Sequence, residues 1–146
     1  MKKLFIAALV ALTISTSAFA QDVNQIDPKA VQNFEATFVG ASKVEWTSKE
    51  SFTKASFLQD EQKVEVFYNP DGDLIATTKQ VKMEELPTFV KRTFTKKYSD
   101  YNVTEAFKFN ADAETNYFVA AENDKESIVL KVANGSISVY SRTSKI

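Results

Sequence analysis

The stretch that decides the fold lies between residues 27 and 46 and reads DPKAVQNFEATFVGASKVEW. It opens with Asp27, whose side chain can cap a helix, and with Pro28, which suits the first helical position. Apolar residues follow at i, i+3 and i+7, and this spacing predicts a helix with one apolar stripe made by Val31, Phe34 and Phe38. Gly40 predicts the end of that helix, because glycine readily takes the left-handed conformation of a helix cap.

Beyond Gly40 the apolar period changes from that of a helix to that of a strand. Val44 and Trp46 alternate with polar neighbours, which predicts a strand whose apolar side chains point into a core shared with the helix. Trp46 is the only tryptophan, and its phase with Val44 favours a core position over an exposed binding anchor. Further strands are predicted near residues 52–58, 64–68 and 73–79, with a turn, NPDG, at residues 69–72.

The same succession starts again after residue 80. A second helix is predicted from about Met83 to Tyr98, with an apolar stripe made by Pro87, Val90, Phe94 and Tyr98. The pair Asn134-Gly135 is a typical two-residue hairpin turn. Strand-like runs surround it at residues 103–109, 116–121, 127–132 and 136–141.

We interpret this order as two tandem copies of one α-β-β-β-β unit, and the alternative is chance similarity between two amphipathic stretches. Phe34 and Phe38 have counterparts 56 positions later, the alternating run 64–68 has one 64 positions later, and Gly72 has one 63 positions later. The two units would cover about residues 27–80 and 83–142. Helices that precede antiparallel strands predict an α+β fold, with the helices packed on one face of the sheet.

The first 20 residues have the layout of a secretory signal peptide. Lys2 and Lys3 precede an apolar run at residues 4–12, and a small, polar stretch ends in the A-x-A site at residues 18–20. Cleavage near Ala20 would leave residues 21–146 as one domain in the periplasm or outside the cell. No later segment is long and apolar enough to span a bilayer, so no stable membrane insertion is expected after signal removal.

The composition of the 146-residue chain excludes most familiar catalytic sites. It has no His and no Cys, so a Ser-His-Asp triad, a cysteine nucleophile, a thiolate zinc site and a disulfide are impossible. A pair of carboxylates is the remaining hydrolytic option, but the acids cluster in predicted turns. The net charge of −1 gives no general attraction to nucleic acid. We therefore predict no catalytic, cofactor-binding or metal-binding residues, and no enzyme activity.

Four motifs resemble a known family. The motif F-x-x-x-F-x-G-A-S-x-V-x-W at residues 34–46 is similar to the opening of the secreted β-lactamase-inhibitor-like, PepSY-like family. The motifs D-G-x-L at residues 71–74, L-P at 86–87 and Y-x-x-Y-x-V at 98–103 continue the resemblance, whereas Val39 stands where the family often has Pro. The resemblance implies tandem units of a helix and a four-stranded sheet, a periplasmic or extracellular location and no established activity. Its inhibitor members suggest protein binding.

Eight residues are predicted to shape the fold rather than to contact a partner. They supply aromatic core side chains, the strand phase, the turns and the start of the second helix: Phe34, Phe38, Gly40, Val44, Trp46, Gly72, Pro87 and Gly135.

The sheet face away from the helices is the predicted binding surface. If Val64, Val66 and Tyr68 face the helices, the residues between them face away, and the same alternation applies to the strands at 127–132 and 136–141. Aromatic anchors within a charged rim are typical of protein-binding surfaces. The outward set is predicted to be Lys63, Glu65, Phe67, Val129, Lys131, Tyr140 and Arg142.

These features together predict an exported, non-enzymatic binding protein that needs no cofactor. It would hold another protein or a peptide on the open sheet face, and inhibition is one form that such binding takes. The alternative function is binding of a small molecule or an envelope polymer between the two repeats. For the sheet face itself, the alternative is a solvated surface with scattered aromatic residues.

Overall fold

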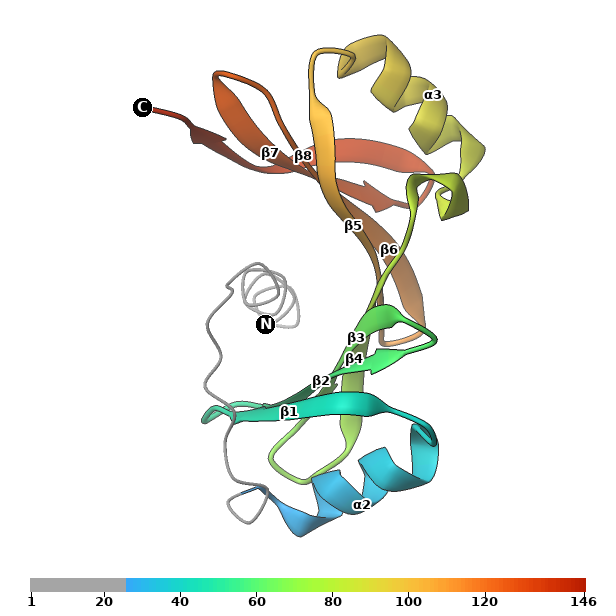
Figure 1. Cartoon of the computed structure of the whole chain (residues 1–146), viewed down its shortest axis with the longest axis vertical. Coiled ribbons are helices and arrows are strands. Elements are labelled where there is room, and N and C mark those ends of the chain that lie inside the picture. Colours follow the sequence, from blue (N-terminus) through green and yellow to red (C-terminus); the bar gives the residue numbers. More distant parts are fainter. Residues whose placement is uncertain (1–25) are drawn as a thin grey trace.

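The computed structural model describes residues 26–146, so the predicted signal peptide and its cleavage site lie outside the described residues. The described chain forms one eight-stranded antiparallel sheet in which every strand pairs with its neighbour in sequence. Two helices and a 3-10 turn accompany it (Figure 1). The elements are α2 (Pro28–Thr37), β1 (Ser42–Ser48), β2 (Thr53–Gln59), β3 (Gln62–Tyr68), β4 (Leu74–Gln80), η2 (Met83–Glu85), α3 (Thr88–Lys97), β5 (Asn102–Ala111), β6 (Glu114–Glu122), β7 (Glu126–Ala133) and β8 (Ser136–Ser144).

Residue pairing across the sheet places both helices on the same face. α2 packs against Val64 of β3, and Val64 pairs with Lys79 of β4, which in turn pairs with Lys108 of β5. Side chains two residues apart in a strand share a face. Ala106, which packs beneath α3, therefore lies on the same face as Val64. Figure 1 shows α2 and α3 at opposite ends of a strongly bent sheet, both on the outer side of the bend. We call the face that they cover the helix face, and the other the concave face.

The sequence predicted the start of α2 correctly. The Asp27 carboxylate accepts a hydrogen bond of 2.8 Å from the backbone N–H of Lys29, and Pro28 occupies the first turn. The helix ends at Thr37, shortly before Gly40, which has a φ of +86°. Phe34 is buried in the middle of this helix, and Phe38, at its C-terminal end, is half-buried.

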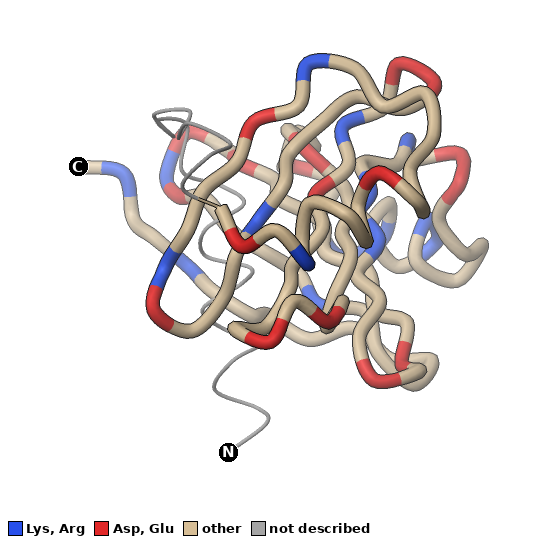
Figure 2. The backbone as a smooth tube through the Cα atoms, turned by 90° about the horizontal axis from the view of Figure 1, so that it is seen from below, with Lys and Arg blue, Asp and Glu red and all other residues tan. Residues whose placement is uncertain are grey.

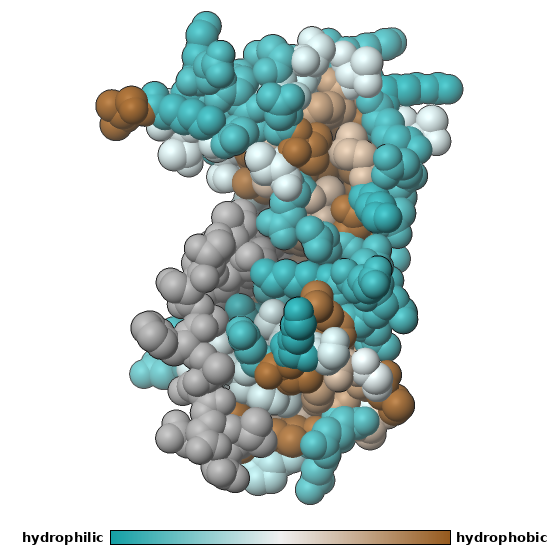
Figure 3. Space-filling model, in the orientation of Figure 1, coloured by the Kyte–Doolittle hydropathy of each residue, from teal (hydrophilic) through white to brown (hydrophobic). Residues whose placement is uncertain are grey.

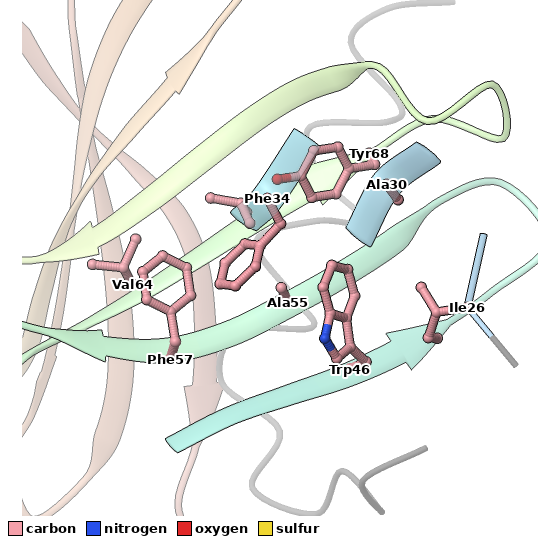
Figure 4. Close-up of a cluster of buried hydrophobic side chains, with 9 residues drawn as sticks. Ile26, Ala30, Phe34, Trp46, Ala55, Phe57, Val64 and Tyr68 are labelled. Atoms are coloured by element: carbon pink, nitrogen blue, oxygen red, sulfur yellow. The ribbon is translucent and has the colours of Figure 1, made fainter. Parts of the chain in front are cut away.

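The core beneath α2 is largely aromatic. The ring of Phe34 lies edge-on to Trp46 at 5.3 Å and to Phe57 at 5.0 Å, and the Trp46 ring stacks near Tyr68 at 6.2 Å (Figure 4). The predicted core position of Trp46 is confirmed, because the residue is only 4% exposed. The Tyr68 hydroxyl is buried without a hydrogen-bond partner, and burial raises the pKa of Tyr68 to about 12.

Val44 is an exception to the predicted alternation. We expected it in the core with Trp46, but it is 37% exposed. The reason is a register shift between Ser42 and Glu45, where Lys43 takes a φ of +52°. Such an irregularity changes the side to which the preceding side chains point.

The helix predicted from Met83 to Tyr98 is in fact two elements. η2 covers Met83–Glu85, and α3 begins only at Thr88. Leu86 between them is extended, with a φ of −73° and a ψ of 150°. The residue before a proline is driven out of the helical region, and Pro87 becomes the N-cap of α3 instead of an interior residue. Val90 is buried and Phe94 is half-buried, as the apolar stripe predicted.

Both predicted turns contain their glycine in the left-handed conformation. Gly72 has a φ of +81° and donates its N–H to the Asn69 carbonyl at 2.9 Å. Gly135 has a φ of +72° and follows Asn134, whose φ is +51°, in a two-residue hairpin. Positive φ at both central positions is the signature of the turn that favours Asn-Gly.

Within residues 26–146, no helix is long and apolar enough to cross a membrane.

Candidate binding face

The concave face of the sheet carries an apolar cluster of its own. Phe67 of β3 pairs with Ala76 of β4, which pairs with Ala111 of β5, and Phe109 and Phe107 continue this face along β5. All members of the cluster come from the strands or from the residue just before β2, and none comes from α2 or α3. The buried members are Phe52, Phe67, Ala76, Phe107, Phe109, Phe118 and Val129, and the partly buried ones are Ile75, Ala111, Ala120 and Tyr140.

Phe118 lies at the centre of this cluster. Its ring stacks on Phe107 at 5.4 Å with an interplanar angle of 17°. It meets Phe109 and Tyr140 edge-on, with ring centroids 6.2 and 5.3 Å apart. These are favourable aromatic geometries, worth about 0.5–1.5 kcal/mol per pair beyond area burial. The contacts cross from β5 to β8 and stiffen that half of the face.

A charged group lies beside the cluster, on β2 and β3. The Glu65 side chain is only 4% exposed, and its two carboxylate oxygens have different surroundings. Oε1 lies 3.4 Å from the Nζ of Lys63, which is well exposed, whereas Oε2 lies 3.8 Å from the Nζ of the buried Lys54. Oε2 has no hydrogen-bond partner. Burial raises the pKa of Glu65, and the two lysines only partly oppose this effect.

A small hollow opens next to this carboxylate, where β3, β4 and β5 meet. Six residues line it: Lys63, Glu65, Thr78, Gln80, Glu105 and Phe107. It has about 10 Å³ of space for a water-sized group, which is room for about one water molecule. The hollow lies on the strands that join the first half of the sheet to the second.

Six of the seven residues predicted to point away from the helices lie on the concave face, but three of those six are buried. Phe67 is fully buried, and Glu65 and Val129 are also buried. Phe67 packs edge-on against Phe52, with ring centroids 5.7 Å apart, and is flanked across the strands by Lys54 and Ala76. In a curved sheet the side chains of the inner face converge and cover one another. Lys63 is exposed, and Lys131 and Tyr140 are half-buried, so these three remain accessible.

Arg142 does not lie on the concave face, which corrects the prediction. The register of β7 and β8 shifts between Val129 and Leu130, so that Tyr140 is an extra residue and Arg142 pairs with Ile128. Ile128 packs beneath α3, on the helix face. There the Arg142 guanidinium lies 3.3 Å from a carboxylate oxygen of Glu126, which also accepts a hydrogen bond from the hydroxyl of Tyr101. That hydrogen bond raises the pKa of Tyr101.

Sequence reasoning missed several residues of this face. Lys54, which pairs with Glu65, and Thr78 and Glu105, which line the hollow, were not proposed, and neither were the aromatic residues Phe107 and Phe118. The alternation of side chains along a strand could have found the two aromatic residues. Once Ala106 and Val119 are assigned to the helix face, their neighbours Phe107 and Phe118 must point to the concave face.

The other charged residues of the described part of the chain are spread along it. Figure 2 shows acidic and basic residues interspersed along the chain, many of them in loops. In the view of Figure 3, hydrophilic side chains make up most of the described surface. Shallow hollows lie at the loops around Asp100 and Asp124 and along Lys91 and Lys96 of α3. Within residues 26–146, no group of three or more acidic side chains could hold a metal ion.

The fold and face define a class of α+β protein in which two helices cover one side of a single eight-stranded antiparallel sheet. No family model and no curated protein sequence matches the chain. Solved structures do share its fold. A DUF2874 family protein from Bacteroides uniformis has a TM-score of 0.71 at 14% identity, over 82% of this chain and 89% of that one.

Two further solved structures share this fold. A candidate periplasmic protein from Bacteroides eggerthii also has a TM-score of 0.71, at 13% identity, over 87% of this chain and 90% of that one. A BLIP-like protein from Bacteroides fragilis has a TM-score of 0.65 at 18% identity, over 85% of this chain and 92% of that one. The chain therefore has a BLIP-like fold. At these low sequence identities, the similarity shows a shared fold and nothing further.

Proposed function

We propose that this chain is an exported, non-enzymatic binding protein that holds another protein or a peptide on the concave face of its sheet. The observation that carries the proposal is the apolar cluster of that face, to which neither α2 nor α3 contributes. A sheet with an apolar face is normally covered by a second layer. The helix face has that layer in the two helices. For the concave face, a partner would supply it.

The accessible residues around the cluster suit protein recognition. Tyr140 offers an aromatic ring with a polar hydroxyl, and Lys131 and Lys63 add charge at the rim. Aromatic residues are enriched at the centres of protein interfaces and charged ones at their edges. In this proposal Phe67 and Val129 form the floor beneath these contacts, and Arg142 has no part in binding.

The export of the protein and its duplication belong to the same proposal. Both halves have the same order of elements, one helix followed by four strands. The counterparts Val64 and Ile128, and Gly72 and Gly135, have matching burial or backbone conformation. The comparison with a candidate periplasmic protein supports export. The signal peptide, its cleavage near Ala20 and the PepSY-like part of the resemblance stay predictions. The BLIP-like neighbour favours a protein as the partner and inhibition as the mode of action.

The alternative, a small molecule or an envelope polymer bound between the halves, has less support. The hollow at the junction of the two halves has room for about one water molecule. Sites for small ligands are typically about 300–1,000 Å³ in volume.

A capture experiment with matched variants tests the proposal. The tagged, processed protein is incubated with envelope extract, and wild type is compared with a concave variant, Tyr140→Ser/Lys131→Ala. The control is Tyr117→Ser/Lys108→Ala, which removes the same two residue types from the helix face, where Lys108 and Tyr117 are paired. Circular dichroism first establishes that both variants fold.

The expected result is at least one partner that wild type and the control recover and that the concave variant loses. That partner, once purified, should bind wild type directly in calorimetry and bind the concave variant at least tenfold more weakly. Equal recovery of every partner by all three proteins would remove the concave face from consideration.

A further inference from the structure

The outer edge of β8 has no neighbouring strand within residues 26–146. β8 is the last strand of the sheet and leads to the C-terminus (Figure 1). Most of its residues are exposed, and from Ser136 to Ser144 it contains no proline and no acidic residue. An edge of this kind can pair with a strand of another chain.

The opposite edge of the sheet, β1, is less suited to pairing. Its register shifts between Ser42 and Glu45, and Lys43 within the shift takes a φ of +52°. Irregularities and charged residues of this kind keep an edge strand from pairing further. β8 also has a register shift, but only at Tyr140, so residues 136–139 form a regular edge.

The register of the hairpin between β7 and β8 determines which backbone groups point outward. Ser136 pairs with Ala133 across the two-residue turn, and the residues that flank such a turn form a hydrogen-bonded pair. Hydrogen-bonded and non-hydrogen-bonded pairs alternate along antiparallel strands. Ile137 and Val139 are therefore at non-hydrogen-bonded positions, where the backbone N–H and C=O groups point away from β7.

This edge is complementary to itself. If two copies of β8 pair antiparallel about a two-fold axis at Ser138, Ile137 of each copy lies opposite Val139 of the other. The outward N–H and C=O groups of both residues then all find partners, as in a regular ladder. Their side chains share the helix face, because their partners in β7, Val132 and Leu130, belong to the core beneath α3. Val139 is 42% exposed in the single chain, and this pairing would cover it.

The charges of β8 permit this pairing and its symmetry limits it to two copies. Residues 136–140, which would face each other, include no charged side chain, and Arg142 lies beyond them. A two-fold contact closes at the dimer, whereas β8 against β1 would be a head-to-tail contact that continues into a filament. A contact made by one short segment of each strand is small, so the dimer should be weak and depend on concentration.

We propose that this protein dimerises through β8, so that a second copy of the chain adds its own β8 to the edge and the two sheets become continuous. The inference does not depend on the proposed protein partner, because it uses only the edge of the sheet. The concave faces of the two copies would lie side by side, with Tyr140 of each opposite Ser136 of the other.

Sedimentation equilibrium of the processed protein between about 10 µM and 1 mM tests the dimer in the range where small interfaces dissociate. Ser138→Lys and Ser138→Glu place a charge at an exposed residue that would lie directly opposite its own copy, where like charges are destabilising. The matched control, Ser144→Lys, makes the same change on the same strand outside the contact. Circular dichroism first establishes that all three variants fold.

The expected result is a molar mass that rises with concentration from one chain toward two, in wild type and in the control alike. Ser138→Lys should dimerise at least about fivefold more weakly, and an equal mixture of Ser138→Lys and Ser138→Glu should recover the association. A monomer at every concentration, growth beyond the dimer, or a dimer indifferent to Ser138→Lys would overturn the proposal. A monomer that loses a captured protein partner in Ser138→Lys would also overturn it, because the edge would then hold a strand of that partner instead of a second copy.

Discussion

Substitution of the two turn glycines, Gly72 and Gly135, tests how tightly the turn between β3 and β4 packs against α2. Gly72 and Gly135 both lie in hairpin turns, with φ values of +81° and +72°. An added Cβ at Gly72 would lie 2.9 Å from the Cβ of Lys29 and 3.1 Å from the backbone nitrogen of Ala30, both in α2. At Gly135 an added Cβ would meet nothing within 4 Å.

The expected losses of stability follow from these contacts. An alanine in the left-handed region costs about 1–2 kcal/mol, and both variants bear this cost. Gly72→Ala must also displace the backbone of α2, and overpacking of this kind adds about 1–3 kcal/mol. The Gly72 turn is held to α2 by a hydrogen bond of 2.7 Å from Asn33 to the Gly72 carbonyl, so it cannot simply move away. We therefore expect losses of about 2–5 kcal/mol for Gly72→Ala and about 1–2 kcal/mol for Gly135→Ala.

Urea unfolding measures both values. Trp46 is the only tryptophan and lies in the core beneath α2, so its fluorescence reports directly on the affected region. Circular dichroism provides a second probe, and coincident transitions establish two-state behaviour. Equal losses in the two variants would refute the reasoning, because they would mean that the turn at Gly72 does not press on α2.

Three further predictions concern single side chains. Trp46→Ala should lower the free energy of unfolding, measured by chemical denaturation, by about 3–5 kcal/mol, because it deletes a large core aromatic. The control Leu74→Ala changes a site that is 46% exposed. It should change the free energy of unfolding by less than about 0.5 kcal/mol. Asp27→Ala should cost about 1 kcal/mol through loss of the α2 cap, and Asp27→Asn should restore most of it; equal melting of the two variants would contradict the capping role. Because burial raises the pKa of Glu65 above 4.5, the folded state binds the extra proton, so stability attributable to Glu65 should fall as pH rises from about 4.5 through the raised pKa. Glu65→Gln should show a flatter pH profile than wild type in that window, and parallel profiles would show that Glu65 ionises alike in both states.

Much of the fold could be predicted because its signals are local. The cap and proline at residues 27–28 mark the start of α2, and the period of two in β3 and β7 marks strands with one face against the helices. The turns at Gly72 and Gly135 were visible from residue type alone. In each case a short run of residues contains the physical cause, so one sequence was sufficient.

The errors arose where a strand departs from regular pairing. Val44 and Arg142 were both assigned by counting in twos. Val44 lies within a register shift and Arg142 follows one, and such a shift reverses the count. A β-bulge depends on the partner strand and on sheet curvature, neither of which appears in the local sequence. The tight turns at Asp60-Glu61 and Asp112-Ala113 also give no local signal. All four residues have positive φ, but neither turn contains the glycine that usually marks this conformation.

The sequence could predict which side of the sheet the candidate residues lie on, but not how exposed they are. Alternation correctly placed Glu65, Phe67 and Tyr140 opposite the helices. It could not reveal how far the sheet bends, and the bend decides that Phe67 is buried while Tyr140 is partly accessible. Burial depends on residues distant in sequence: Phe52 packs against Phe67, and Phe118 packs against Tyr140.

The charged pair on the concave face is the strongest reason to regard that face as more than a second core. Burial of Glu65 and Lys54 removes two charges from water, and an ion pair 3.8 Å apart recovers only part of that cost. Apolar residues of similar volume at both positions would commonly be as stable or more so. A face required only for stability would have no use for an unsatisfied carboxylate next to Phe107.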